Sequence, residues 1–258
     1  MMRFEGKVAI VTGGASGIGA ATTRLLAREG ARVMVADLDG DRAWALAAEI
    51  GGTAHALDVA DRAAVEALVD AAVAAHGGLD ILVNNAGIGS FGRTPDMDPA
   101  AWERVIAIDL HAVFYACRAA LPHLIAGRGA IVNTASISGL AGDYGFGAYA
   151  AAKAGLVNYT RTLALDHARD GVRANALCPG LIDTPLTAGA AAVPGLGERW
   201  HDAVPMGRAG TAEEMAAAIA FLASDAASYV TGAVLVADGG MTAWTGQPNL
   251  LRAMEGVA

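Results

Sequence analysis

The chain is predicted to fold as an α/β protein with a doubly wound parallel sheet covered by helices on both faces. Short apolar runs alternate with segments of helical periodicity almost to the end of the sequence, as parallel strands joined by crossover helices require. A glycine-rich segment, residues 12–19, joins the first run to the first periodic segment. No linker, repeat or low-complexity stretch divides the chain, so residues 1–258 are interpreted as a single domain.

The predicted strands are short runs rich in β-branched residues, such as Val8, Ile10 and Val11 in the first of them. They cover residues 7–12, 31–37, 53–57, 79–83, 130–135, 172–177 and 233–236. The predicted helices repeat apolar residues every three or four positions, and Asp61 is expected to cap the third of them. They cover residues 17–29, 41–50, 61–76, 99–125, 148–169 and 211–224, with an irregularity near Asp109.

Two segments fall outside this pattern. Residues 183–210 contain three prolines and several glycines, and we expect an irregular lid over a substrate site there. Residues from about 246 onward are expected to form a C-terminal tail.

Composition excludes several classes of function. The formal charge of −8 argues against a nucleic-acid partner, because phosphate binding requires a basic surface. No uninterrupted apolar stretch reaches the ~20 residues of a membrane helix, and no apolar signal region opens the chain, so a cytoplasmic protein without a membrane partner is predicted. Cys117 and Cys178 are expected to be reduced thiols. The six histidines form no ligand pattern, so no metal is expected.

Two predicted helices are apolar on more than one side, over residues 102–124 and 156–165. Something must cover the additional apolar surface. We expect a homo-oligomer interface, and deep burial within one subunit is the alternative.

The glycine turn predicts a dinucleotide site. Glycines at positions 13, 17 and 19 allow a tight turn and a close backbone approach, and the helix that follows offers free N–H groups to a pyrophosphate. Asp37 closes the second strand, eighteen residues after Gly19, where a carboxylate accepts hydrogen bonds from the adenosine ribose and repels a 2′-phosphate. Neither Ser16 nor Leu38, which flank this position, is basic, so NAD is favoured over NADP. The alternative is that Asp37 caps the next helix.

Tyr149 and Lys153 lie four residues apart on a predicted helix and therefore share one face. An adjacent cation favours a phenolate, which makes the phenol a general acid/base for an alcohol oxygen. Lys153 is one of only two lysines in the chain, and Ser136 lies thirteen residues before Tyr149. The alternative is a lysine on a solvated helix face.

Six features follow one another along the chain: the glycine turn, Asp37, Asn-Asn-Ala-Gly at 84–87, Ser136, Tyr149 with Lys153, and Pro179-Gly180. In this order they resemble the short-chain dehydrogenase/reductase family, in its oligomeric branch of about 250 residues. The resemblance covers residues 4–242. It implies a Rossmann-type sheet of seven parallel strands, a homotetramer, and hydride transfer between a nicotinamide and a carbonyl or secondary alcohol.

The resemblance also implies roles for single residues. Tyr149 would exchange a proton with the substrate oxygen, Lys153 would support the phenolate and hold the nicotinamide ribose, and Ser136 would donate a hydrogen bond to the carbonyl. Ser138 is the alternative serine, and the thirteen-residue spacing favours Ser136. The expected cofactor contacts, beside Tyr149 and Lys153, are Gly13, Ser16, Gly17, Ile18, Gly19, Asp37, Leu38, Asp58, Val59, Asn85, Ala86, Gly87, Pro179, Gly180, Ile182 and Thr184. Asn84 is expected to stabilise the sheet.

One position departs from the family. Where the family usually carries an asparagine that holds a water on the path from the lysine to solvent, this chain has Asp109. Asp109 is therefore included among the catalytic candidates, either through its backbone or through its carboxylate. Asp109→Asn is expected to leave most of the activity.

The expected substrate pocket is mostly apolar and partly aromatic. Besides Ser136 and Tyr149 it would include Ser138, Tyr144, Phe146, Leu181 and Leu186, with Trp200 and Met206 in the lid. This lining favours a hydrophobic or cyclic ketone or secondary alcohol. A 3-oxoacyl carrier-protein reductase is the alternative, and a non-catalytic nucleotide-binding regulator is a more remote one.

Overall fold

The computed structural model describes residues 2–191, 193–247 and 254. Within them, seven parallel strands form one sheet in the order β3-β2-β1-β4-β5-β6-β7, which confirms the predicted fold class. The strands are β1 (Val8–Thr12), β2 (Arg32–Asp37), β3 (Thr53–Ala56), β4 (Ile81–Asn84), β5 (Ala130–Thr134), β6 (Arg173–Pro179) and β7 (Val234–Ala237). The first and last residues of each strand lie within two positions of the predicted ones. The strand signal was strongest in β1, β4 and β5, which are buried along their whole length.

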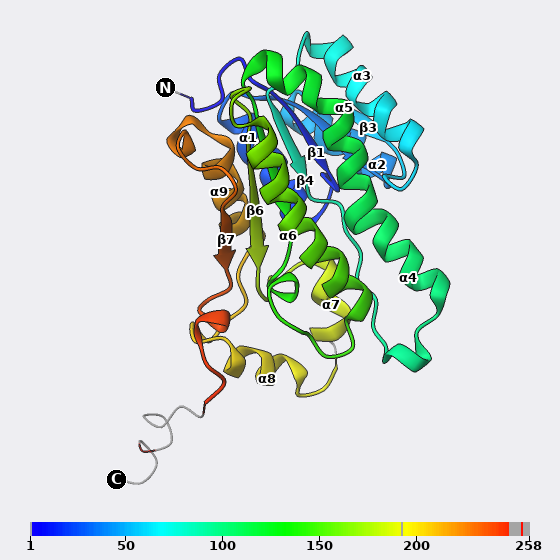
Figure 1. Ribbon diagram of the computed structural model, residues 1–258, viewed down its shortest axis with the longest axis vertical. Helices are drawn as coiled ribbons and strands as arrows, with labels where there is room; N and C mark the ends of the chain where they lie inside the picture. Colours follow the sequence, from blue (N-terminus) through cyan, green and yellow to red (C-terminus); the bar gives the residue numbers. More distant parts are fainter. Residues whose placement is uncertain (1, 192, 248–253, 255–258) are drawn as a thin grey trace.

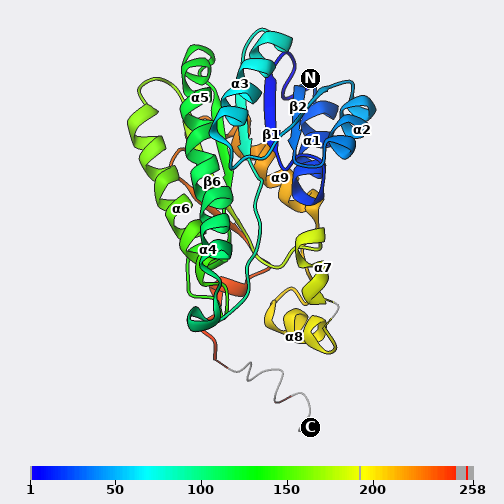
Figure 2. The ribbon, with the colours of Figure 1, turned by 90° about the vertical axis from the view of Figure 1, so that its right-hand side faces the viewer.

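Two layers of helices enclose the sheet (Figure 2). One layer consists of α1 (Gly17–Arg28), α2 (Gly40–Ile50) and α9 (Ala212–Ala223). The other consists of α3 (Arg62–His76), α4 (Pro99–Ile106), α5 (Ala112–Gly127) and α6 (Gly147–His167). Alternate residues of β1 point to the two layers. Ile10 packs in the core under α3, α5 and α6, whereas Ala9 and Val11 pack in the core under α1 and α9.

The helices begin where the sequence supplies caps. The Asp61 carboxylate accepts hydrogen bonds from the N–H groups of Ala63 (2.8 Å) and Ala64 (3.3 Å), which confirms its predicted role at α3. Thr211 and Glu214 form a reciprocal capping box at α9.

A π-helical turn, η2 (Ala107–His111), interrupts the long helix between α4 and α5 and confirms the irregularity predicted near Asp109. By length and composition, the whole stretch Pro99–Gly127 could cross a membrane. The search for uninterrupted apolar runs in the sequence did not find it, because polar residues interrupt the stretch. In the structure 44% of its most apolar window is buried. It packs on α3 and on the strands β4 and β5, as a core helix of an α/β sheet does.

The lid segment (residues 183–210) was predicted to be irregular, and this prediction was wrong. It contains α7 (Pro185–Ala191) and α8 (Leu196–Ala203), which lie beyond the carboxyl ends of the strands (Figure 1). Pro185 occupies the first position of α7, where its fixed φ suits a helix. The 3₁₀ turns η1, η3, η4 and η5, also not predicted, cover Thr94–Asp96, Ile137–Gly139, Asp225–Ala227 and Met241–Ala243. The predicted tail from about 246 lies mostly outside the described residues.

The two strongly apolar helices are explained in part by burial within the subunit. Leu156, Val157 and Leu163 of α6 are buried. Leu165 and Phe114 remain 81% and 47% exposed, so burial in one subunit leaves part of the apolar surface open to solvent.

Candidate active site

A cavity opens at the carboxyl ends of the strands, beside the point where β1 has β2 on one side and β4 on the other. This reversal of strand order is where open α/β sheets bind their ligands. The cavity is open to solvent. Its predicted lining residues are Gly13, Ser16, Gly17, Ile18, Asn85, Ala86, Gly87, Ser136, Tyr149, Lys153, Pro179, Gly180, Ile182, Thr184 and Leu186. Thr134, Ala135, Pro185 and Thr187 also line it and were not predicted.

The glycine turn is built for close backbone contact. Gly13 has a positive φ of 59°, and a Cβ there would lie 2.9 Å from the Cα of Ala86. A Cβ on Gly19 would lie 1.9 Å from the carbonyl oxygen of Gly13, so Gly19 serves the packing of the turn and does not line the cavity. Only glycine therefore fits at positions 13 and 19.

The N-terminus of α1 faces this cavity. Ser16 occupies the N-cap position, but its side chain makes no capping hydrogen bond. The first N–H groups of α1 therefore have no side-chain partner, and the positive end of the helix dipole lies beside Gly17 and Ile18. A helix terminus of this kind fits a pyrophosphate.

Asn85 ties the glycine turn to the end of β4. Its Nδ2 donates hydrogen bonds to the carbonyl oxygens of Thr12 and Gly13, each at 3.2 Å. In return the Thr12 hydroxyl oxygen accepts from the backbone N–H groups of Asn85 (3.0 Å) and Ala86 (3.2 Å). Residues 85–87 are thereby held against the floor of the cavity.

Asn84 lies on the other side of β4, inside the protein. Its Nδ2 donates to Asn133 Oδ1 at 2.8 Å, and Asn133 Nδ2 donates to the Thr160 hydroxyl at 2.8 Å. The network joins β4, β5 and α6, in agreement with the structural role predicted for Asn84.

Asp37 is fixed at the end of β2 by backbone donors. Its Oδ2 accepts from Ala15 N at 2.9 Å and its Oδ1 from Asp39 N at 3.0 Å. Asp39, not Asp37, caps α2, so the alternative interpretation of Asp37 as that cap was wrong. Arg42, the nearby cation, is paired with Asp39 at 3.1 Å, and Leu38 is 70% exposed.

Asp58 and Val59 follow β3 at the same edge, outside the cavity. Asp58 accepts from Ala60 N at 3.0 Å and from an Arg104 Nη at 2.8 Å. Burial alone would raise the pKa of Asp58, but these two donors outweigh it and hold the pKa below its usual value. Val59 is buried in the core beneath. Arg104 was not predicted, because it lies on α4, far away in sequence.

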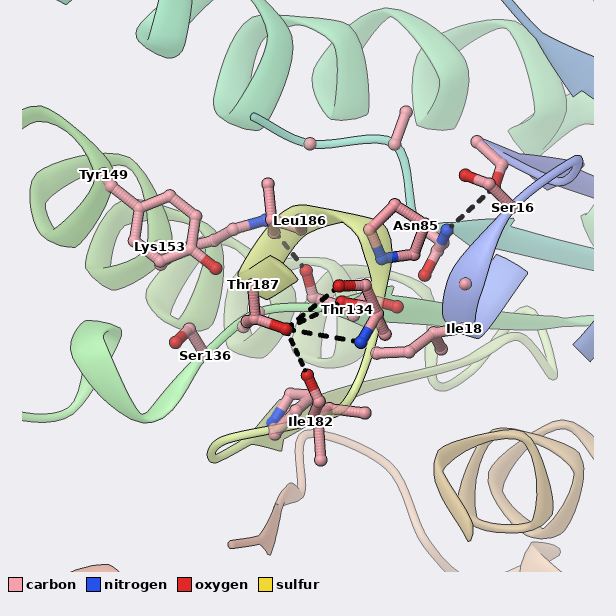
Figure 3. Close-up of a pocket in the computed structure, with 18 of the residues that line it drawn as sticks. Ser16, Ile18, Asn85, Thr134, Ser136, Tyr149, Lys153, Ile182, Leu186 and Thr187 are labelled. Carbon is pink, nitrogen blue, oxygen red and sulfur yellow. Dashed lines mark hydrogen bonds between the residues drawn. The ribbon is translucent and has the colours of Figure 1, made fainter. Parts of the chain in front are cut away.

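Ser136, Tyr149 and Lys153 gather at one end of the cavity, while Ser16, Ile18 and Asn85 lie at the other (Figure 3). Ser136 lies two residues after the end of β5, and Tyr149 and Lys153 occupy the first two turns of α6. The Lys153 Nζ lies 5.4 Å from the centre of the Tyr149 ring. Lys153 is only 3% exposed, so the alternative of a lysine on a solvated helix face was wrong.

Two acceptors hold the Lys153 ammonium group. It donates to the carbonyl oxygen of Thr134 at 3.0 Å and lies 3.1 Å from Asp109 Oδ2. The other oxygen of Asp109 accepts from Ile88 N at 2.9 Å. Burial lowers the pKa of Lys153, but the charges of Asp109 and Tyr149 act in the opposite direction and raise it overall. The ammonium therefore stays charged at neutral pH.

The two candidate serines have different environments. Ser136 lines the cavity, and its Oγ accepts from Ser138 N at 3.1 Å. The Ser138 hydroxyl is turned to Asp143 and donates to its Oδ2 at 2.7 Å. Of the two serines, Ser136 is the one that shares the cavity with Tyr149.

The predicted substrate residues fall into two groups. Leu186 lines the cavity from α7, and Phe146, outside the lining, packs edge-on against Tyr149 (6.3 Å between ring centres) and Phe91 (5.5 Å). Tyr144 is 97% exposed, and Leu181 does not line the cavity. Trp200 and Met206 also lie outside its lining. Within the described part of the chain, no group of three or more histidine, cysteine or acidic residues is placed to hold a metal ion.

The chain is similar to several known proteins. A family model described as enoyl-(acyl carrier protein) reductase matches residues 13–242. The meso-2,3-butanediol dehydrogenase of Serratia marcescens is 42% identical over 97% of this chain and 100% of its own. The cis-4-hydroxycyclohexanecarboxylate dehydrogenase of Sinomonas cyclohexanicum is 48% identical over 93% of this chain and 98% of its own.

Among solved structures, levodione reductase superposes with a TM-score of 0.90 at 37% identity, covering 93% of this chain and 99% of its own. Fold, cavity and relatives thus lead to the same assignment. The chain belongs to the short-chain dehydrogenase/reductase family and is an oxidoreductase that works with a nicotinamide cofactor.

Proposed function

We propose that the protein interconverts a secondary alcohol and a ketone with NAD(H), and that Tyr149 is the general acid/base. The observation that carries the proposal is the position of Tyr149, Lys153 and Ser136 in one cavity with the glycine turn. The relatives named above act, by their names, on a butanediol and a hydroxycyclohexanecarboxylate, both of which carry secondary hydroxyl groups.

In the direction of oxidation, the alcohol loses a hydride from carbon and a proton from oxygen. When bound, the nicotinamide supplies the hydride acceptor. The Tyr149 phenolic oxygen takes the proton, and the Lys153 charge stabilises the negative charge that this oxygen carries. The Ser136 hydroxyl donates a hydrogen bond to the substrate oxygen and fixes its position. Reduction follows the same path in reverse.

The residues of the cavity fit a dinucleotide. The glycine turn and the N-terminus of α1 would hold the pyrophosphate, and residues 85–87 would lie beneath the cofactor. Lys153 would hold the nicotinamide ribose, and Pro179, Gly180, Ile182 and Thr184 would surround the nicotinamide. Asp58 and Val59 would lie along the adenine.

The choice of NAD over NADP rests on Asp37. Its carboxylate is fixed by two backbone N–H groups, so it cannot turn away from a 2′-phosphate without losing both. Arg42, the nearby cation, is already paired with Asp39. A 2′-phosphate would therefore meet a fixed negative charge, and Arg42 would have to leave Asp39 to balance it.

A hydrophobic or cyclic substrate suits the aromatic wall of Phe91 and Phe146 beside Tyr149. The alternative of a 3-oxoacyl carrier-protein reductase gains no support from the lid, because Arg208 is paired with Glu214. A non-catalytic regulator does not account for a lysine buried beside a tyrosine in the same cavity as the glycine turn.

A cytoplasmic homotetramer is also part of the proposal. A groove between α5 and α6 is lined mostly by apolar and aromatic residues, among them Leu110, Phe114 and Tyr159. Phe114 is 47% exposed there. A second copy of this chain would cover the apolar face.

The test is a panel of secondary alcohols, including cyclohexanol and 2,3-butanediol, assayed with NAD and with NADP. We expect turnover with NAD, and Tyr149→Phe should lower kcat by about 10²- to 10⁴-fold. Tyr229→Phe is the matched control, because Tyr229 is fully exposed and should leave the rate unchanged. A Tyr149→Phe variant as active as the parent would refute the acid/base role.

A further inference from the structure

A buried ion pair lies directly behind the catalytic tyrosine. Asp109 is fully buried and Lys153 is 3% exposed, and their charged atoms are 3.1 Å apart. We propose that the Asp109 carboxylate is a permanent counter-ion of Lys153 and so determines the pH range in which Tyr149 accepts the alcohol proton. This inference rests on the proposed function. It makes Asp109 a positioning residue, because it acts on Tyr149 through Lys153.

The local structure fixes the carboxylate. Asp109 lies in the π-helical turn η2, and its Oδ1 is held by the backbone N–H of Ile88. Its Oδ2 makes no other hydrogen bond among the described residues and faces the ammonium group of Lys153. An ionised carboxylate satisfies both neighbours at once.

Backbone closes over the pair. A Cβ placed on Gly87 would lie 3.1 Å from Asp109 Oδ2 and 3.3 Å from Lys153 Nζ. The main chain at Gly87 therefore packs closely against both charged groups. In such a setting electrostatic effects are screened far less than in water.

The groups that face Lys153 come from four elements. They are the Asp109 carboxylate of η2, Tyr149 on its own helix, the Thr134 carbonyl of β5 and Cys178 of β6. Burial raises the pKa of Cys178 to about 11, so this thiol is neutral at working pH. Asp109 thus supplies the full negative charge among these groups.

The electrostatic consequence has a definite sign. A lone cation beside Tyr149 would stabilise the phenolate strongly, but a cation paired with a carboxylate does so less. The distances from Lys153 place the carboxylate within roughly 8.5 Å of the phenol ring centre. A buried charge at this range is worth about one pH unit at an effective dielectric constant of about 20. With Asp109 in place, the acidic limb of the kcat–pH profile for alcohol oxidation is therefore expected at higher pH than with an unpaired Lys153 cation.

The experiment compares the pH dependence of kcat for alcohol oxidation in the parent and in Asp109→Asn. The amide keeps the shape and can still accept from Ile88 N. We expect the acidic limb of the kcat–pH profile to lie about one pH unit lower in Asp109→Asn than in the parent. At pH values above this limb the two enzymes should have similar kcat. Asp109→Glu, which keeps the charge, should leave the limb near that of the parent. Asp80→Asn is the matched control, because it breaks the pair with the chain's other lysine, Lys7 (3.0 Å), away from the site.

A second readout does not depend on turnover. Tyrosine labelled with ¹³C at Cζ reports ionisation of the phenol by NMR, and Tyr149→Phe identifies the signal. The Tyr149 signal should titrate about one pH unit lower in Asp109→Asn than in the parent. If that variant does not fold, Asp109→Ser removes the same charge and carries the same expectation.

The two proposals fail in different ways. A parent enzyme that oxidises no alcohol refutes the proposed function, while the NMR titration still decides the role of Asp109. The counter-ion role would be overturned if removal of the carboxylate left the acidic limb and the Tyr149 signal in place, or moved them to higher pH.

Discussion

Gly87 offers the sharpest test of the packing around Lys153, through the substitution Gly87→Ala. The added methyl would lie 3.1 Å from Asp109 Oδ2 and 3.3 Å from Lys153 Nζ. Ordinary contacts at a Cβ begin near 3.4 Å, so the ion pair must move by a few tenths of an ångström. Neither group can leave readily, because each is buried and hydrogen-bonded to backbone.

The magnitude follows from this displacement. Overpacking a buried site costs about 1–3 kcal/mol, and ~2 kcal/mol lowers Tm by roughly 4–8 °C in a protein of this size. Since a misplacement of 1 Å at a catalytic group can cost about 10²-fold, a shift of a few tenths should lower kcat/KM by about 10-fold.

The assay measures kcat/KM for alcohol oxidation together with Tm by calorimetry, and NADH binding by fluorescence. Gly89→Ala is the matched control, since a Cβ at Gly89, two residues further along the same loop, meets nothing within 4 Å. If Gly87→Ala keeps its affinity for NADH, the loss of rate is caused by displacement of Lys153 and not by a blocked cofactor site. If Gly87→Ala and Gly89→Ala have the same rate and the same Tm, the main chain at Gly87 does not confine the Asp109–Lys153 ion pair.

Three further predictions concern other parts of the molecule. Asp61→Ala removes the N-cap of α3 and should cost about 1 kcal/mol, or roughly 2–4 °C in Tm by calorimetry; an unchanged Tm would contradict it. Burial raises the pKa of Cys117 to about 12 and that of Cys178 to about 11, so both thiols are protonated at pH 8. Neither should react with a disulfide reagent in the native protein, and both should react in denaturant; rapid native labelling would contradict this. Phe114→Glu places a charge on the exposed groove of α5 and should reduce the mass found by light scattering from that of a tetramer, whereas an unchanged mass would place the interface elsewhere.

The sequence predicted the framework of the fold because its signals are local. The run Val8 to Thr12 is buried throughout, so its β-branched composition identifies β1 almost to the residue. The same holds for the cap at Asp61, whose partners lie two and three positions ahead.

The lid could not be predicted because its two helices are short and their periodicity is weak. Residues 185–191 are mostly small, and seven residues do not establish an apolar face. The helix at 196–203 begins after a glycine in the left-handed region, which reads as a turn.

The details of the site depend on contacts between distant segments. The sequence singled out Asp109 for its residue type, but only the structure shows that its carboxylate faces Lys153, forty-four residues away. Arg104 carries no motif, and its contact with Asp58 arises because α4 crosses the edge where β3 ends. Pairings of this kind follow from tertiary structure and have no local signature.

The stretch from Arg104 to Asp109 contacts two parts of the site, Asp58 and Lys153, that an enzyme designer would want to alter separately. Arg104 contacts Asp58, the carboxylate proposed to lie beside the adenine, and Asp109, five residues later, contacts Lys153. A change of Asp58 would free a guanidinium on the same helical stretch as Asp109. A library that varies the expected adenine edge should therefore also be screened for the pH dependence of turnover.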